Sequence, residues 1–134
     1  MNSRFLLDTC TVIWLTQKQP ISRSASSILA TTAELHVSPV TAWEMAMLIS
    51  RERIDQPNGA KRWFEEFLAE NGAWEIGVTA DIFIASCSLP RPLHKDPIDR
   101  ILIATGRQHD LTLVTRDRAI LAYGAAGHVK TLAC

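Results

Sequence analysis

The sequence predicts an α/β fold in which a central parallel sheet of four to five short strands is flanked by helices. Short apolar runs, typical of buried strands, alternate along the chain with longer segments of helical periodicity. Strands that alternate with helices pair in parallel through right-handed crossovers, which gives a doubly wound, three-layer sandwich. At 134 residues, the chain is expected to form one domain over residues 1–134.

The first half of the chain is predicted to contain two strands and four helices. The apolar run before Asp8 is so short that it fits a strand better than a helix. Pro39 opens a helix, because proline in the first turn lacks only a donor that would be orphaned anyway. The predicted elements are a strand at Arg4–Leu7, helices at Thr9–Thr16 and Ser22–Ala33, a strand at Leu35–Val37, and helices at Val40–Arg51 and Gly59–Glu70.

The second half is predicted to alternate strands and helices around a proline-rich loop. Three prolines interrupt the loop Leu89–Pro97, and Asp96 with Pro97 then begins a strongly periodic helix. The predicted elements are a strand at Trp74–Val78, helices at Thr79–Leu89 and Asp96–His109, a strand at Leu111–Thr115, a short helix at Arg118–Tyr123 and a fifth strand at Val129–Leu132.

Composition and charge exclude several classes of protein. Lys plus Arg and Asp plus Glu both number 14, so the chain has no global basic field and would bind nucleic acid only locally. Three cysteines without paired spacing predict neither a disulfide framework nor a zinc site, and Cys87, in an apolar run, is expected in the core. No apolar stretch is long enough to cross a membrane, so a cytoplasmic protein is expected.

Acidic side chains are predicted to converge at one edge of the sheet. Asp8 and Asp117 follow two predicted strands, and ligands of open parallel sheets bind outside the carboxyl ends of the strands. Asp99 lies in the first turn of a helix that can pack back toward this edge, with Asp96 at the start of that helix. Glu44 falls within an apolar helical stripe, where a carboxylate without a partner is costly.

Carboxylates this close would repel one another and raise their pKa values unless a cation neutralised them. Mg²⁺ or Mn²⁺ suits carboxylate, water and phosphate ligands, and such an ion can activate water for attack on phosphorus. We therefore interpret the cluster as a metal-dependent site that hydrolyses phosphodiester bonds. Asp8, Glu44 and Asp99 would bind the ion directly or through water, and Asp117 would bind it or support the other acids.

The same aspartates also have a structural interpretation. Asp8, Asp96 and Asp117 each precede a predicted helix, where an N-cap contributes about 1 kcal/mol. Asp99 would favour the helix dipole from the first turn. Glu44 is harder to explain in this way, and the joint placement of the acids favours a functional site.

Three segments carry a resemblance to a known family. The runs LLDTCTVIWL, SPVTAWEMAM and HKDPIDRILIATGRQHDLTLVTRD, in this order, resemble the PIN-domain ribonucleases, specifically the VapC-type toxins of bacterial type II toxin–antitoxin pairs. The resemblance covers nearly the whole chain, and the last segment is the most specific. It implies a single PIN domain, an endoribonuclease that uses Mg²⁺ with Mn²⁺ as a substitute, an RNA substrate, a homodimer and inhibition by a cognate antitoxin.

The resemblance also implies roles for particular residues. A lysine frequent in the family one turn after the helix glutamate is replaced by Leu48, which leaves Arg100 and Arg116 as alternative sources of positive charge or as structural ion pairs. We further expect an antitoxin to insert a basic side chain into the acidic groove. The family's acids fall on Asp8, Glu44, Asp99 and Asp117, and accessory positions fall on Asp96, Thr9, Thr115 and Arg116.

Two other functions remain open at this stage. A phosphatase that forms an aspartyl-phosphate usually needs a second aspartate two residues after the first, where this chain has Cys10. A catalytically silent PIN-like module that binds RNA or protein would need no cluster of destabilising acids. The RNA target, the number of metal ions and the identity of the antitoxin are not contained in these patterns.

Overall fold

The computed structural model describes residues 3–30, 34–92 and 95–134, and its centre is a five-stranded sheet with the order β3-β2-β1-β4-β5. Every strand pair is parallel, which confirms the predicted fold class. The elements are β1 (Arg4–Leu7), α1 (Thr9–Thr16), α2 (Arg23–Leu29), β2 (Glu34–Val37), α3 (Pro39–Ser50), α4 (Gly59–Asn71), β3 (Trp74–Glu75), α5 (Ala80–Ser86), α6 (Pro97–His109), β4 (Thr112–Thr115), α7 (Arg118–Ala125) and β5 (Thr131–Ala133).

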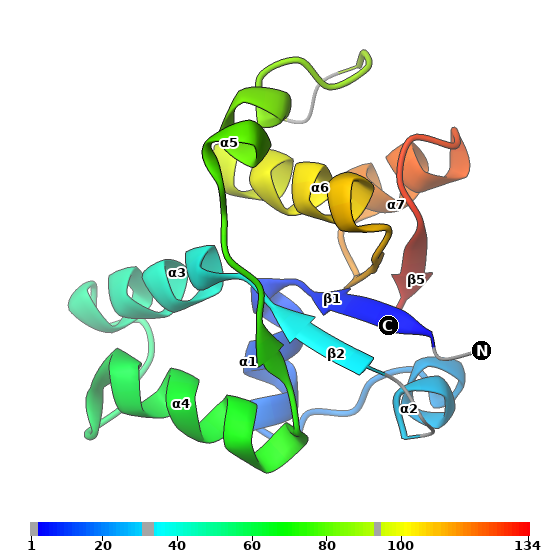
Figure 1. Ribbon diagram of the computed structural model, residues 1–134. Coiled ribbons are helices and arrows are strands. Elements are labelled where there is room, and N and C mark those ends of the chain that lie inside the picture. The colour runs from blue at the N-terminus through cyan, green and yellow to red at the C-terminus, as the bar shows by residue number, and fades with distance from the viewer. Residues whose placement is uncertain (1–2, 31–33, 93–94) are drawn as a thin grey trace.

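Helices cover both faces of the sheet, as a purely parallel sheet requires. Figure 1 shows α5, α6 and α7 on one side and α1 and α4 on the other. Successive residues of β1 alternate between the two cores, because side chains of a strand point to opposite faces. Phe5 and Leu7 pack with the buried residues of α1 to α4, whereas Leu6 packs with those of α5 to α7. Across the described residues, no helix is long and apolar enough to span a membrane.

Several predicted boundaries differ from the structure. β3 ends at Glu75 rather than Val78, because its neighbour β2 ends at Val37 and offers no partner beyond that register. α5 is shorter than predicted, with Thr79 as its N-cap and Cys87 as its C-cap. β5 is shifted toward the C-terminus, to Thr131–Ala133.

α2 ends at Leu29, and residues 31–33 of the predicted Ser22–Ala33 helix lie outside the described residues, as do residues 93–94 of the predicted loop. The expectation that Cys87 is a core residue was wrong, since its place at the end of a short helix leaves it exposed. Three aromatic side chains of α4, those of Trp63, Phe64 and Phe67, are buried in the core.

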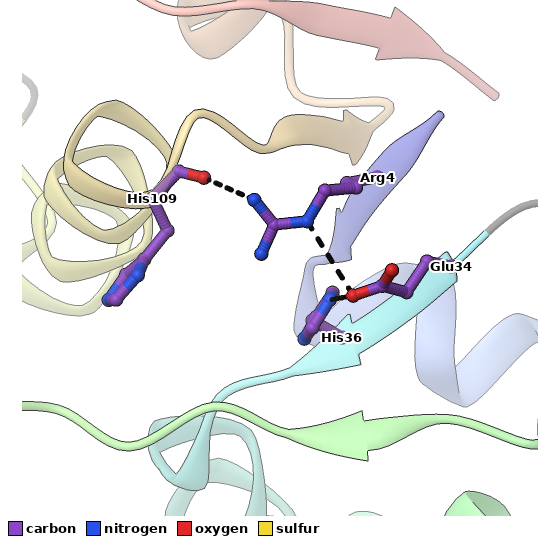
Figure 2. Close-up of polar contacts among 4 residues, drawn as sticks. All are labelled: Arg4, Glu34, His36 and His109. Atoms are coloured by element: carbon purple, nitrogen blue, oxygen red, sulfur yellow. Dashed lines mark hydrogen bonds and ion pairs between the residues drawn. The ribbon is translucent and has the colours of Figure 1, made fainter. Parts of the chain in front are cut away.

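A polar network ties the amino-terminal edge of the sheet to the end of α6 (Figure 2). Arg4 donates from Nη1 to the carbonyl oxygen of His109 at 2.9 Å, and its Nε lies 3.5 Å from Glu34 Oε1. His36 Nε2 lies 2.7 Å from the same oxygen, and this hydrogen bond is the main reason that the pKa of Glu34 is lowered. The network links β1, β2 and the C-terminus of α6, so the opposite end of α6 is directed to the carboxyl edge of the sheet.

Candidate active site

The carboxyl ends of β1 and β4 lie side by side at the centre of the sheet. The chain leaves β1 toward β2 on one side and leaves β4 toward β5 on the other, so the two connections diverge between them. Such a switch point is the usual ligand site of an open parallel sheet. Asp8 and Asp117 stand there as the N-caps of α1 and α7, which confirms the structural interpretation of both residues.

Asp8 is the most buried acid of the site, with an exposed fraction of 6%. Its Oδ1 accepts a hydrogen bond from the Thr11 backbone N–H at 2.8 Å, and its Oδ2 accepts one from Thr115 Oγ1 at 2.5 Å. The Thr115 hydroxyl in turn accepts a hydrogen bond from the Asp117 backbone N–H at 3.1 Å. Burial raises the pKa of Asp8, these hydrogen bonds oppose the rise, and the charge of Asp117 adds to it.

Glu44 reaches the same place from α3, a helix that begins at Pro39 after the N-cap Ser38. Its Oε1 accepts a short hydrogen bond from Thr9 Oγ1, which lies 3.1 Å from the hydroxyl of Thr41. Burial raises the pKa of Glu44, and the charges of Asp96 and Asp8 raise it further against the hydrogen bond from Thr9. Although its neighbours on α3 are apolar, the Glu44 side chain therefore lies in a polar cluster at the edge of the sheet and not in the core.

The remaining two acids come from the start of α6. Asp96 is the N-cap, and its Oδ1 accepts hydrogen bonds from the backbone N–H groups of Ile98 at 2.8 Å and Asp99 at 3.4 Å. Asp99 lies in the first turn, partly buried, where the positive end of the helix dipole favours a carboxylate.

A cleft of about 440 Å³ brings these residues together. All five acids expected at the site line it, and so do Thr9 and Arg116 from the accessory positions. Thr115 lies behind the wall as a donor to Asp8, whereas Arg100 is partly buried on α6 and does not line the cleft. The lining residues are Asp8, Thr9, Cys10, Trp14, Glu44, Asp96, Asp99, Arg116 and Asp117.

Two residues that contribute to the site, one polar and one aromatic, were not predicted from the sequence. Thr41 stands three residues before Glu44 on the same helical face, and this spacing is a signal that could have found it. Trp14 lines the cleft from α1, but nothing in its sequence surroundings distinguishes it from the core residues of that helix.

Helix capping and ligand binding are compatible roles for these aspartates. A carboxylate has about four acceptor positions on its two oxygens, and a cap hydrogen bond takes one of them. The donors in the cleft are carboxylate and hydroxyl oxygens, which is the ligand set that Mg²⁺ and Mn²⁺ prefer. Among the described residues, no three acidic, histidine or cysteine side chains are grouped closely enough to form a ready-made metal site.

We expect Asp8→Asn to stabilise the protein at neutral and higher pH in the presence of chelator. Because the pKa of Asp8 is raised in the folded state, its protonated form stabilises the fold at low pH, and this contribution is lost as pH rises through the folded pKa. The free energy of unfolding from urea titrations at about pH 8 should increase by about 1–3 kcal/mol, because the variant no longer buries a charge that its hydrogen bonds only partly compensate. The increase should shrink toward about pH 4.

Asp81→Asn is the matched control, because Asp81 is exposed in the first turn of α5. That variant should change the free energy of unfolding by less than about 1 kcal/mol. A loss of stability in Asp8→Asn at about pH 8 would mean that the hydrogen bonds from Thr11 and Thr115 outweigh the burial of the charge.

Comparison with known proteins places these residues in a family. The model of the PIN domain family matches residues 5–125. Ribonuclease VapC22 from Mycobacterium tuberculosis is 31% identical over 110 residues, which cover 82% of this chain and 83% of that protein.

Two solved structures of low sequence identity share the fold. VapBC2 from Rickettsia felis, bound to a DNA fragment from its promoter, has a TM-score of 0.72 at 15% identity, with 97% of this chain and 98% of that chain covered. DNA-bound VapBC from Salmonella typhimurium has a TM-score of 0.68 at 16% identity, with 99% and 98% covered. The family model and the Mycobacterium relative together show that the chain belongs to the PIN-domain family, among the VapC-type ribonucleases.

Proposed function

We propose that the protein is a metal-dependent endoribonuclease and the toxin of a toxin–antitoxin pair. The observation that supports this most directly is the convergence of five carboxylates in one cleft at the switch point of the sheet. The relative that is named a ribonuclease supports hydrolysis of RNA as the reaction. We further propose Mg²⁺ as the metal, with Mn²⁺ as a substitute, because the donors are hard oxygen atoms.

Each acid has a role in this proposal. Asp8, Glu44 and Asp99 would hold the ion directly or through water, and Asp117 would either bind it or support Asp8 through Thr115. When bound, a divalent cation supplies a Lewis acid that activates water and neutralises charge on the phosphate. Thr9 and Thr115 orient Glu44 and Asp8 by donating hydrogen bonds to them, and Asp96 adds a further acid to the wall of the cleft.

The proposed cation also addresses the electrostatics of the cleft. Asp8 and Glu44 both have raised pKa values, and in each case a neighbouring carboxylate contributes to the rise. A cleft with this excess of negative charge would repel a phosphodiester. A divalent ion would favour the ionised, metal-binding form of both acids and reduce the repulsion of the substrate.

The first test is cleavage of structured and single-stranded RNAs by the purified protein with Mg²⁺, with Mn²⁺ or with chelator. We expect cleavage only with metal, and a loss of at least about 100-fold in kcat/KM for both Asp8→Asn and Asp99→Asn. Asp81→Asn, an exposed acid on α5, should retain the activity of the wild type.

Equal behaviour of wild type and the Asp8 and Asp99 variants would show that these acids have only structural roles at helix N-termini and that any cleavage comes from contamination. The protein would then be better described as a PIN-like module that binds RNA or protein without cutting it. Calorimetry with Mn²⁺ provides a second readout, because the wild type should bind the ion and Asp8→Asn should bind it more weakly.

We propose that a cognate antitoxin inhibits the protein by placing a basic side chain in the acidic cleft. The two VapBC complexes that share the fold support an antitoxin partner, and the five acids of the cleft suit an arginine or lysine. Co-expression with the antitoxin should abolish cleavage, and an alanine at the inserted basic residue should restore it. An antitoxin that binds tightly but leaves hydrolysis unchanged would contradict this mode of inhibition.

We also propose a homodimer that uses the exposed apolar side chains of α5. Phe83 and Ile84 are neighbours on this helix, with exposed fractions of 50% and 68%. Light scattering of the wild type should give twice the mass of the chain, and Ile84→Glu should give a monomer, because a charge in an apolar interface is strongly unfavourable. Trp74→Glu on β3 is the control and should leave the mass unchanged. A monomeric wild type, or a dimer in the Ile84 variant, would contradict the proposed interface.

A further inference from the structure

Arg116 brings a positive charge into the acidic cleft. It is the only lysine or arginine among the nine described residues that line the cleft, and the other charged ones are all acids. The chain as a whole has a net charge of zero, so the attraction of a polyanion has to come from local cations. Arg100, the other candidate for this role, does not line the cleft.

The guanidinium of Arg116 is held in one position although the residue is exposed. Its central carbon lies 3.9 Å from the centroid of the Trp14 ring, a cation–π contact. Its Nη2 donates hydrogen bonds to the carbonyl oxygens of Cys134 at 3.0 Å and Pro20 at 3.3 Å. A long side chain fixed in this way has less rotamer freedom to lose when it binds a ligand.

These contacts use only part of the hydrogen-bonding capacity of the side chain. A guanidinium has five N–H donors in a planar fork, and both carbonyl oxygens are bound by the same terminal nitrogen. The N–H groups on Nε and Nη1 take no part in these two contacts and can donate to the oxygens of a phosphate. Within the described part of the chain, no ion pair is found between Arg116 and the side chain of an aspartate or glutamate.

We propose that Arg116, positioned by Trp14, binds a backbone phosphate of single-stranded RNA beside the acids of the cleft. The inference rests on the proposed nuclease function and adds the residue that holds the substrate. Arg116 precedes Asp117 in sequence, so a phosphate on the guanidinium lies next to the acids rather than on a distant surface. The stacked ring makes the position of the charge specific, which a flexible lysine could not reproduce.

The test measures kcat and KM on a short single-stranded RNA between about 50 and 200 mM salt, with melting temperatures for every variant. Arg116→Ala should raise KM by about tenfold while kcat changes by less than about threefold, which is the pattern of lost substrate binding. It should also reduce the slope of log KM against log salt by about 0.7, the value for one phosphate contact on a single strand.

Three further variants separate charge, stacking and general electrostatics. Arg116→Lys should keep the salt slope and show a smaller rise in KM, because it retains the charge without the planar fork. Trp14→Leu should raise KM without changing the slope, because it removes the stacking but not the charge. Arg118→Ala is the matched control, since Arg118 is exposed two residues away and does not line the cleft, and it should behave as the wild type.

Fluorescence anisotropy of the same RNA in chelator keeps this proposal separate from the nuclease proposal. Binding that depends on Arg116 in a protein that does not cut would support Arg116 and refute the nuclease. Cleavage by the wild type with an unchanged KM and salt slope in Arg116→Ala would refute the role of Arg116 alone.

Other outcomes would also overturn the assignment. In one of them, Arg116→Ala and Arg116→Lys both lower the melting temperature and kcat while the slope of log KM against log salt stays unchanged. That result would show that Arg116 only holds Cys134 and the segment around Pro20 in place. Equal losses in Arg118→Ala would show a general charge effect. A wild type that neither binds nor cuts RNA would refute both proposals.

Discussion

The site depends on one buried carboxylate at the junction of two strands. β1 and β4 pair with Leu7 opposite Val114, which places Asp8, the first residue after β1, beside Thr115, the last residue of β4. The Asp8 backbone N–H continues this pairing by donating to the Val114 carbonyl oxygen at 3.2 Å. The next residue, Thr9, donates a hydrogen bond to Glu44, which links the start of α1 to α3 beside Asp8.

Helix N-termini partly offset the repulsion between the crowded carboxylates. Asp8, Asp96 and Asp117 cap three helices that begin at the same cleft, and each cap contributes about 1 kcal/mol against the repulsion of its neighbours. Backbone N–H groups and the positive ends of the helix dipoles thereby stabilise negative charge that the strands alone could not support. Capping and the proposed cation binding are therefore compatible with the same geometry rather than competing explanations.

Local patterns explain why much of the fold and the acidic site could be predicted from the sequence. Asp8 and Asp117 were found because parallel strands bring their carboxyl ends to one edge, and this rule needs only the positions of the strands. The length of β3 could not be predicted, because it is set by where β2 ends. The contact between Trp14 and Arg116 was also out of reach, since it joins residues from α1 and the turn after β4 through tertiary packing.

The two edges of the sheet use charge in opposite ways. At the amino edge, Arg4 and His36 compensate Glu34, and the pKa of that acid is lowered (Figure 2). At the carboxyl edge, the pKa values of Asp8 and Glu44 are raised, because burial and neighbouring acids outweigh their hydrogen bonds. A network that satisfies its own charges stabilises a fold and offers little to a ligand. The acids of the cleft, in contrast, would gain stability from an added cation, and this difference supports the carboxyl edge as the proposed active site.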